Sequence, residues 1–267
     1  MSSASRPSPR EFRRRFQAGE TLLGTFLKTP TGHAAEILGS VGLDFVVLDV
    51  EHAPFDRGSV DRTLMGARAG GIAGIVRVAH EGEILGALDD GAAGVLVPHV
   101  SSPERAREVV ACARYRGGKR GFSNSPRAGD YGGRGIWPHV DAQDAEVTVI
   151  AMIEDPEALD CLDAILAVPG LDGAFIGRGD LTVALGAPAM DAPAVRDAAE
   201  KILAAAKRAN KPICMMVANA AEAADFARLG ASAFIVASDQ GLMRQMAAKV
   251  LADFKPLKAT DQEGKPA

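Results

Sequence analysis

Charged and imidazole side chains follow several apolar runs of this sequence, at the points where those runs end. The run "VVLD" closes with Asp49 and is followed almost at once by Glu51 and His52. A histidine takes up and releases protons near neutral pH, and a neighbouring carboxylate can orient it. The stretch is therefore a candidate for general acid–base chemistry.

Two further carboxylates, Glu154 and Asp180, end the later runs "VTVIAMIED" and "GAFIGRGD", with no Cys or His beside them. Oxygen ligands alone suit a hard divalent ion such as Mg²⁺ or Mn²⁺ better than structural zinc. Arg77 ends another run, and its permanent charge could stabilise an oxyanion. His99 ends a fourth run and could contact a substrate or merely face it.

Each of these residues also has a structural explanation. Glu154 fits the first turn of a helix, where the helix dipole favours a carboxylate. Asp180 could cap a short helix over "LTVALG", and Arg77 could simply pair with Asp49 or Glu51. What favours a functional site is that all of these side chains follow strands, provided that the strands form one sheet.

Short apolar runs alternate with amphipathic segments along the chain. The expected strands are Leu23–Leu27, Phe45–Leu48, Gly74–Arg77, Gly94–Pro98, Val147–Ile153, Gly173–Ile176, Pro212–Val217 and Ala233–Ala237. The expected helices are Gly32–Val41, Arg57–Ala69, Glu81–Asp89, Pro103–Arg114, Asp155–Val168, Ala192–Ala209, Ala220–Leu229 and Gln240–Phe254. Strands that are apolar on both faces indicate a parallel sheet covered by helices. Eight such units in 267 residues favour a (β/α)8 TIM barrel over an open sheet.

Active sites of such barrels lie at the C-terminal ends of the strands. Glu154 and Asp180 follow neighbouring strands there, so their carboxylates can converge on one ion. The whole chain, 1–267, is expected to form one domain with an ordered core over 20–255 and flexible tails at 1–9 and 257–267. A short basic helix is expected over 10–19. The glycine-rich stretch 115–137, between units four and five, is expected to be an extended loop with a functional or interface role.

Composition excludes several classes of protein. The net charge of −4 gives no attraction to nucleic acid or to an anionic membrane surface. No apolar run is long enough to span a bilayer, and the first residues lack the apolar region of a secretory signal. Three widely spaced cysteines indicate reduced thiols. These features predict a cytoplasmic protein that acts on small molecules.

The stretches "GHAAEILGSVGLDFVVLDVEHAPFD", "ALDDGAAGVLVPHV", "AMIEDPEAL", "VPGLDGAFIGRGDL" and "LGASAFIVASD" resemble the HpcH/HpaI aldolase family. The resemblance extends in order over residues 20–250. It implies a class II pyruvate aldolase on a (β/α)8 barrel, dependent on Mg²⁺, Mn²⁺ or Co²⁺. Such an enzyme reversibly cleaves a 4-hydroxy-2-oxo acid, or a 2-keto-3-deoxy sugar acid, to an aldehyde and pyruvate through a pyruvate enolate held at the metal. The resemblance also implies a homo-oligomer, a trimer or hexamer.

The resemblance assigns roles to individual residues. His52 corresponds to the catalytic base, and Arg77 to the arginine that stabilises the transition state and contacts the substrate. Glu154 and Asp180 correspond to the metal ligands. Asp180 and the backbone of Gly179 correspond to substrate contacts.

The partner of the histidine stays open between two aspartates. The resemblance places at Asp89 a residue that raises the basicity of His52. The expected barrel puts Asp89 at the end of a helix, near the far end from His52. Asp49 is the nearer partner by that reasoning.

This sequence departs from the family pattern in two places. Some members carry a substrate-binding Gln two residues before the metal-binding Glu, where this chain has Met152, which cannot donate a hydrogen bond. The family's Gly-Pro-x-Asp turn is replaced here by Gly177, Arg178, Gly179 and Asp180. We hypothesise that Arg178 attracts an acceptor that bears a carboxylate.

Three alternative functions stay open. An oxaloacetate decarboxylase would use the same enolate site without needing a base. A Schiff-base aldolase could use Lys28, which follows the first expected strand. An inactive barrel could serve as a binding or scaffold protein, and it would then bind neither metal nor pyruvate.

Overall fold

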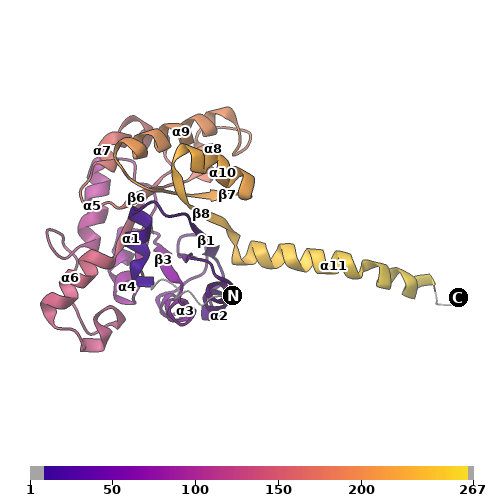
Figure 1. Ribbon diagram of the computed structural model, residues 1–267, viewed down its shortest axis with the longest axis horizontal. Helices are drawn as coiled ribbons and strands as arrows, with labels where there is room; N and C mark the ends of the chain where they lie inside the picture. Colours follow the sequence, from indigo (N-terminus) through magenta and orange to yellow (C-terminus); the bar gives the residue numbers. More distant parts are fainter. Residues whose placement is uncertain (1–8, 264–267) are drawn as a thin grey trace.

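The computed structural model describes residues 9–263 and contains a closed barrel of eight parallel strands, numbered in sequence order around it (Figure 1). The strands are β1 (Leu22–Leu27), β2 (Phe45–Asp49), β3 (Ala73–Arg77), β4 (Gly94–Val97), β5 (Thr148–Ile153), β6 (Gly173–Ile176), β7 (Ile213–Val217) and β8 (Ala231–Ser238). The expected (β/α)8 barrel with a short N-terminal helix is confirmed.

Helices surround most of the barrel. The α-helices are α1 (Phe12–Gln17), α2 (Gly32–Val41), α3 (Arg57–Ala69), α4 (Ile84–Asp89), α5 (Pro103–Ala113), α6 (Ile136–Glu146), α7 (Leu162–Leu166), α8 (Arg178–Ala184), α9 (Pro193–Arg208), α10 (Ala220–Leu229) and α11 (Asp239–Glu263). Short 3-10 segments are η1 (Pro9–Glu11), η2 (Glu81–Glu83), η3 (Arg127–Gly132) and η4 (Pro156–Asp160). Local signals set several ends: Ser102 caps α5 ahead of Pro103, and Gly230 ends α10 in the left-handed conformation that favours glycine.

Strands β2 to β6 are buried on both faces, whereas β1, β7 and β8 each expose part of their outer face, and the protein has two apolar cores. One core fills the inside of the barrel with alternate strand residues, among them Phe26, Val47, Ile75, Met152 and Phe175. The other lies between the sheet and the helices. This arrangement explains why the strands are continuously apolar in sequence.

The short helix α1 closes the end of the barrel where the strands begin. Phe12 and Phe16 stack on each other, and Phe12 also packs on Phe45, the first residue of β2. Asp172, just ahead of β6, accepts hydrogen bonds from Arg13 and Arg114, each at 2.9 Å. The interior of the barrel is therefore closed at this end and opens at the opposite end, where the strands finish.

Several expected helices are shorter or divided. The segment expected to form one helix over 155–168 forms η4 and α7, separated by Cys161 with non-helical φ and ψ of −132° and 23°. The segment 81–89 likewise begins as 3-10 helix before α4. In both segments the apolar residues are spaced as in one longer α-helix. The first turn of each, however, is a 3-10 turn, which is wound more tightly.

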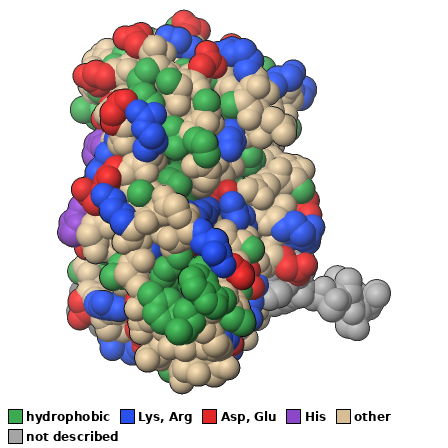
Figure 2. Space-filling model, turned by 90° about the vertical axis from the view of Figure 1, so that its left-hand side faces the viewer, with side chains coloured by type: hydrophobic (Ala, Val, Ile, Leu, Met, Phe, Trp, Pro, Cys, Tyr) green, Lys and Arg blue, Asp and Glu red, His purple; other side chains and the backbone are tan. Residues whose placement is uncertain are grey.

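The stretch 115–137 is more structured than expected. It contains η3, and α6 begins within it at Ile136, a helix that the sequence pattern did not indicate. Asp130 and Tyr131 have positive φ and interrupt the helical turns. Its exposed apolar side chains include Phe122, Tyr131, Ile136 and Trp137, and Figure 2 shows hydrophobic surface gathered low on the side of the molecule where α6 lies.

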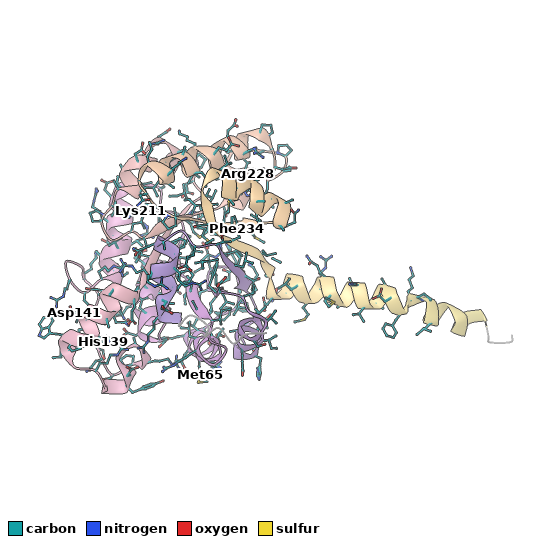
Figure 3. All side chains as sticks on the ribbon, viewed as in Figure 1. Met65, His139, Asp141, Lys211, Arg228 and Phe234 are labelled. Atoms are coloured by element: carbon teal, nitrogen blue, oxygen red, sulfur yellow. The ribbon has the colours of Figure 1, made fainter. Side chains whose placement is uncertain are left out.

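The C-terminal helix α11 projects away from the barrel (Figure 1), and its side chains reach into open space on every side in Figure 3. Helix α11 continues through Pro256 to Glu263, into the stretch 257–267 for which a flexible tail was expected. Residues 1–8 and 264–267, which include most of the other expected tail, lie outside the described residues. Within 9–263 no helix is long and apolar enough to cross a membrane.

Candidate active site

The centre of the site is Asp49, the last residue of β2, which is fully buried. Its Oδ1 accepts from Nε of Arg77 at 2.9 Å, and its Oδ2 lies 2.7 Å from a terminal nitrogen of the same guanidinium. Lys28 donates to Oδ2 at 2.5 Å. Burial alone would raise the pKa of Asp49, but hydrogen bonds from Arg77 and Lys28 hold it below its ordinary value. The carboxylate is thus a charged anchor for two cations.

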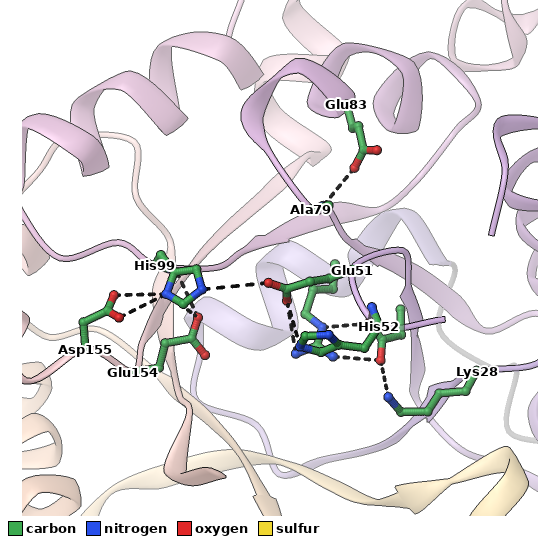
Figure 4. A network of polar contacts seen from close by, with 10 residues as sticks. Lys28, Glu51, His52, Ala79, Glu83, His99, Glu154 and Asp155 are labelled. Carbon is green, nitrogen blue, oxygen red and sulfur yellow. Dashed lines mark hydrogen bonds and ion pairs between the residues drawn. The ribbon is translucent and has the colours of Figure 1, made fainter. Parts of the chain in front are cut away.

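His52 lies just beyond this anchor, as Figure 4 shows. Its backbone N–H donates to Oδ1 of Asp49 at 3.0 Å, whereas its imidazole Nε2 lies 3.7 Å from Oε2 of Glu51. Asp49, the expected partner of His52, thus contacts its backbone, and the carboxylate of Glu51 lies beside the ring. The imidazole is 56% exposed, so a substrate can reach it.

Arg77, the last residue of β3, is held on three sides. Besides Asp49, its guanidinium lies 3.4 Å from a carboxylate oxygen of Glu51 and 5.0 Å from the centre of the Phe26 ring. Two carboxylates and an aromatic face leave the side chain almost no rotational freedom. A fixed cation of this kind can stabilise negative charge without reorganising during a reaction.

Glu154 follows β5 and is only 2% exposed. Burial raises its pKa to about 7, and the negative charges of Asp180 and Glu51 act in the same direction against one hydrogen bond from the backbone N–H of His99. When a carboxylate is buried beside other carboxylates, its negative charge is not fully offset by the groups around it. A cation placed between Glu154 and Asp180 would relieve that repulsion.

Asp180 reaches the site from the first turn of α8, which begins three residues earlier than the sequence pattern indicated. Gly177 precedes that helix, and its N–H donates to the carbonyl of Ile153 at 3.0 Å. A Cβ on Gly177 would lie 2.5 Å from Cβ of Glu154, so glycine is required for this close approach. A Cβ on Gly179 would meet no atom within 4 Å, so that backbone borders open space.

The donor set fits a hard divalent ion with few protein ligands. Within residues 9–263, no group of three or more His, Cys, Asp and Glu side chains is arranged to hold a metal. Glu154 and Asp180 supply oxygen atoms only, and the raised pKa of Glu154 shows a need for positive charge. Mg²⁺ and Mn²⁺ are commonly bound by one or two carboxylates, with water or substrate oxygens completing the shell.

His99 belongs to the same network, although the sequence left its role open. Its Nδ1 lies 3.0 Å from Asp155, and its Nε2 lies 4.0 Å from Glu51 (Figure 4). Its φ of 54° lies in the left-handed region, which is strained for a non-glycine residue. Asp155 and the surrounding carboxylates raise the pKa of His99 against the effect of burial. Its position at a strand end was the only signal in the sequence.

Lys28 directly follows β1 and lies close to the site. Its ammonium group donates to Asp49, and its backbone N–H is fixed by Asp239 at 2.8 Å. An ammonium ion that is paired with a buried carboxylate has no free electron pair for attack on a carbonyl group. The Schiff-base alternative therefore finds no support in this geometry.

Three other predicted site residues lie apart from this network. Asp89 pairs with Arg120 at 3.0 Å and stands at the end of α4, just ahead of β4, where the barrel strands begin. Met152 is buried in the core inside the barrel. The guanidinium of Arg178 is not a free cation at the mouth, because it is bound to Glu222 at 2.7 Å. The structure therefore does not bring Asp89 to His52 within one chain.

Comparisons with known proteins agree with this arrangement. A 5-keto-4-deoxy-D-glucarate aldolase of Klebsiella pneumoniae is 33% identical over 252 residues, covering 92% of this chain and 97% of that protein. A solved HpcH/HpaI aldolase/citrate lyase family protein from Burkholderia cenocepacia has a TM-score of 0.87 at 28% identity, covering 92% of this chain and 99% of that one. The structure of citrate synthase SbnG has a TM-score of 0.84 at 27% identity, covering 93% and 98%.

The family model described as HpcH/HpaI aldolase/citrate lyase matches residues 22–245, which includes every strand and the whole network around Asp49. The resemblance read from the sequence is thereby confirmed, and it supports lyase chemistry of the aldolase type. The chain belongs to the HpcH/HpaI aldolase/citrate lyase family.

Proposed function

We propose that the protein is a class II aldolase, dependent on a divalent metal, that reversibly cleaves a 4-hydroxy-2-oxo acid to pyruvate and an aldehyde. The observation that carries this proposal is the buried Glu154, whose pKa is raised to about 7 beside Asp180, with Arg77 and His52 at neighbouring strand ends. These residues combine a place for a cation, a fixed positive charge and an accessible imidazole.

A sugar diacid is the substrate class that we favour. The relative from Klebsiella pneumoniae is named for 5-keto-4-deoxy-D-glucarate. Numbered from the end that bears the keto group, that compound is a 4-hydroxy-2-oxo acid with a second carboxylate at the far end. Cleavage between its third and fourth carbons would release pyruvate and an aldehyde that carries a carboxylate.

The residues of this chain account for the proton and charge movements. The imidazole of His52 removes the proton of the C4 hydroxyl as the carbon–carbon bond breaks, and then delivers that proton to the methylene carbon of the enolate to give pyruvate. In the reverse direction it removes a proton from the pyruvate methyl group and returns it to the aldehyde oxygen. Arg77, fixed by Asp49, stabilises the negative charge that develops on oxygen. Mg²⁺ or Mn²⁺ held by Glu154 and Asp180 would act as a Lewis acid for the keto acid. Gly179 leaves room for substrate at the start of α8.

The deciding experiment is proton–deuterium exchange at the methyl group of pyruvate, followed by NMR. We expect exchange with Mn²⁺ or Mg²⁺, and none with EDTA or in Glu154→Gln. In His52→Ala exchange should be slow, while the variant still binds Mn²⁺. Exchange that persists in EDTA would contradict the proposal. Decarboxylation of oxaloacetate that survives in His52→Ala without any aldol cleavage would indicate the decarboxylase instead.

We also propose that the protein is a homo-oligomer, in line with the trimer or hexamer implied by the resemblance. Apolar residues of α11 are exposed, including Met243, Met246, Val250 and Phe254, and the outer wall of the barrel exposes Leu23, Met216 and Val236. The apolar residues of α11 have no packing partner, and this part of the barrel wall has no covering helix. The two surfaces are complementary, so α11 of one copy can cover the wall of a second copy. Light scattering after gel filtration should show an oligomer that Val250→Asp weakens. A monomeric wild-type protein would refute this.

A further inference from the structure

Arg178 opens α8 and lies between two residues of the candidate metal site, Gly177 and Asp180. Its side chain is 9% exposed. One terminal nitrogen donates to Oε1 of Glu222 at 2.7 Å, and the other donates to the carbonyl of Met216 at 2.8 Å. A buried guanidinium with two such partners is a structural anchor and not a free charge.

The partners of Arg178 are themselves fixed. Glu222 stands in the first turn of α10, and its second oxygen accepts from the backbone N–H of Ala218 at 2.6 Å. The guanidinium also lies 5.0 Å from the centre of the Phe226 ring, on the same helix. Arg178 therefore ties the start of α8 to β7 and α10 through three separate contacts.

The other side of the same turn is tied to β5. The N–H of Gly177 donates to the carbonyl of Ile153, and Gly177 packs directly against Glu154. The turn that carries Asp180 is thus held between β5 on one side and β7 and α10 on the other. Asp180 itself is exposed and, in contrast to Asp49, makes no hydrogen bond among those found within residues 9–263.

We propose that Arg178 is a positioning residue that sets the place of the Asp180 carboxylate relative to Glu154, and with it the affinity of the site for a divalent cation. This inference rests on the proposed function only in taking Glu154 and Asp180 as the metal ligands. It replaces the hypothesis that Arg178 attracts the acceptor, because its guanidinium is already bound to Glu222.

The sign of the effect separates positioning from simple electrostatics. Arg178 is a cation close to a site for a cation, so removing its charge alone would lower the repulsion and tighten metal binding. Loss of an anchor has the opposite effect, because a ligand that no longer lies in place binds more weakly. Residues that orient metal ligands typically change affinity about 10–100-fold when they are replaced.

The experiment is a titration of the full-length, metal-free protein with Mn²⁺, in which free Mn²⁺ is measured by electron paramagnetic resonance. We expect Arg178→Met to raise the Kd for Mn²⁺ about tenfold. The matched control is Arg127→Met, near the start of β4. Arg127 is half-buried, with its side chain 10% exposed, and it likewise pairs with one carboxylate, Asp61 at 2.7 Å, and donates to backbone carbonyls, those of Asp90 at 2.7 Å and Asp61 at 3.4 Å. It should lose similar stability with an unchanged Kd.

A second variant covers the case in which Arg178→Met does not fold. Arg178→Lys keeps the charge but can satisfy only one of the two partners, and we expect a Kd about threefold higher than that of the wild type. An unchanged or lower Kd in the variant that folds overturns the inference, as does an equal rise in Arg127→Met. If Glu154→Gln leaves Mn²⁺ binding intact, the metal site itself is wrong and both proposals fail.

Discussion

Replacing Glu154 with glutamine should stabilise the metal-free protein at high pH, although Glu154 is a proposed ligand. The carboxyl group is buried, and its pKa is raised from 4.5 to about 7 in the folded protein. In the unfolded chain the group loses its proton near its ordinary pKa. Between these values the folded protein binds more protons than the unfolded chain, so its stability falls as the pH rises.

The size of the effect follows from the two pKa values. The rise from 4.5 to about 7 is a difference of about 2.5. At about 1.4 kcal/mol for each pKa unit, the ionised Glu154 destabilises the folded state by about 3 kcal/mol above pH 7, and by almost nothing below pH 4.5. Glutamine has nearly the same shape and no charge to desolvate, so it removes this penalty.

The assay is urea denaturation of both proteins in EDTA at several pH values from 4.5 to 8. The free energy of unfolding of Glu154→Gln minus that of the wild type should increase by about 3 kcal/mol over this range. Adding Mn²⁺ at pH 8 should stabilise the wild type but not the variant. Glu200→Gln is the control, because Glu200 forms an exposed pair with Arg196 on α9, and its difference should change by less than about 1 kcal/mol.

A difference that stays constant with pH would refute the reasoning, since it would mean that the folded protein does not hold Glu154 in an unfavourable charged state. A difference that decreases as the pH rises would show that another positive group already compensates the carboxylate. Either result would also weaken the case for a cation site between Glu154 and Asp180.

Three further predictions concern neighbouring residues. His52→Ala should lower kcat for aldol cleavage, measured as pyruvate release, about 10²–10⁴-fold with Mn²⁺ binding retained, and an unchanged kcat would exclude His52 as the base. Gly177→Ala should weaken Mn²⁺ binding about 10–100-fold because its Cβ meets Glu154 at 2.5 Å, whereas Gly179→Ala, which meets nothing within 4 Å, should raise KM with the Kd for Mn²⁺ unchanged. Asp49→Ala should cost about 3–5 kcal/mol in urea denaturation, because it leaves buried Arg77 unpaired, and a loss below 1 kcal/mol would contradict this.

The sequence was most informative where local pattern and packing agree. All eight strands were expected within a few residues of their observed ends, because each is a mostly apolar run, and five of them, β2 to β6, are buried on both faces. The elements that were missed depend on context. Helix α6 has little amphipathic pattern, so no periodic signal marks it. The 3-10 segments η2 and η4 carry the apolar spacing of an α-helix, so the sequence pattern does not distinguish the two kinds of helix. Helix α11 runs past its expected end at Phe254 to Glu263, through Pro256 and a mostly polar stretch that resembles a loop in sequence.

In the candidate site, too, the local sequence predicted some features, and others depend on tertiary contacts. The barrel rule placed Glu51, His52, Arg77, Glu154 and Asp180 on one rim, since each follows a strand. The pairing of Arg77 with Asp49 and Glu51 was among the expectations, but the contacts of Asp49 with Lys28 and of Glu154 with His99 were not, because these residues come from different strands.

The position of Arg178 illustrates the point. By itself, a Gly-Arg-Gly-Asp turn reads as a cation at the mouth of the site. In the structure, α10 brings Glu222 and Phe226 to the guanidinium, and the cation becomes an anchor. These residues are far apart in sequence, and only the order of the strands around the barrel makes them neighbours.

By itself, the sequence determined the fold, the family and the types of side chain at each strand end, because these depend on periodicity and on residues next to one another in the chain. Only the tertiary structure decided which groups meet. Because β1 and β3 pair with β2 on either side, Lys28, just after β1, and Arg77 of β3 meet the carboxylate of Asp49, which leaves Glu51 as the carboxylate beside His52. A buried carboxylate pairs with the cations that lie beside it in the fold. Strand register decides which cations those are, and distance along the sequence does not.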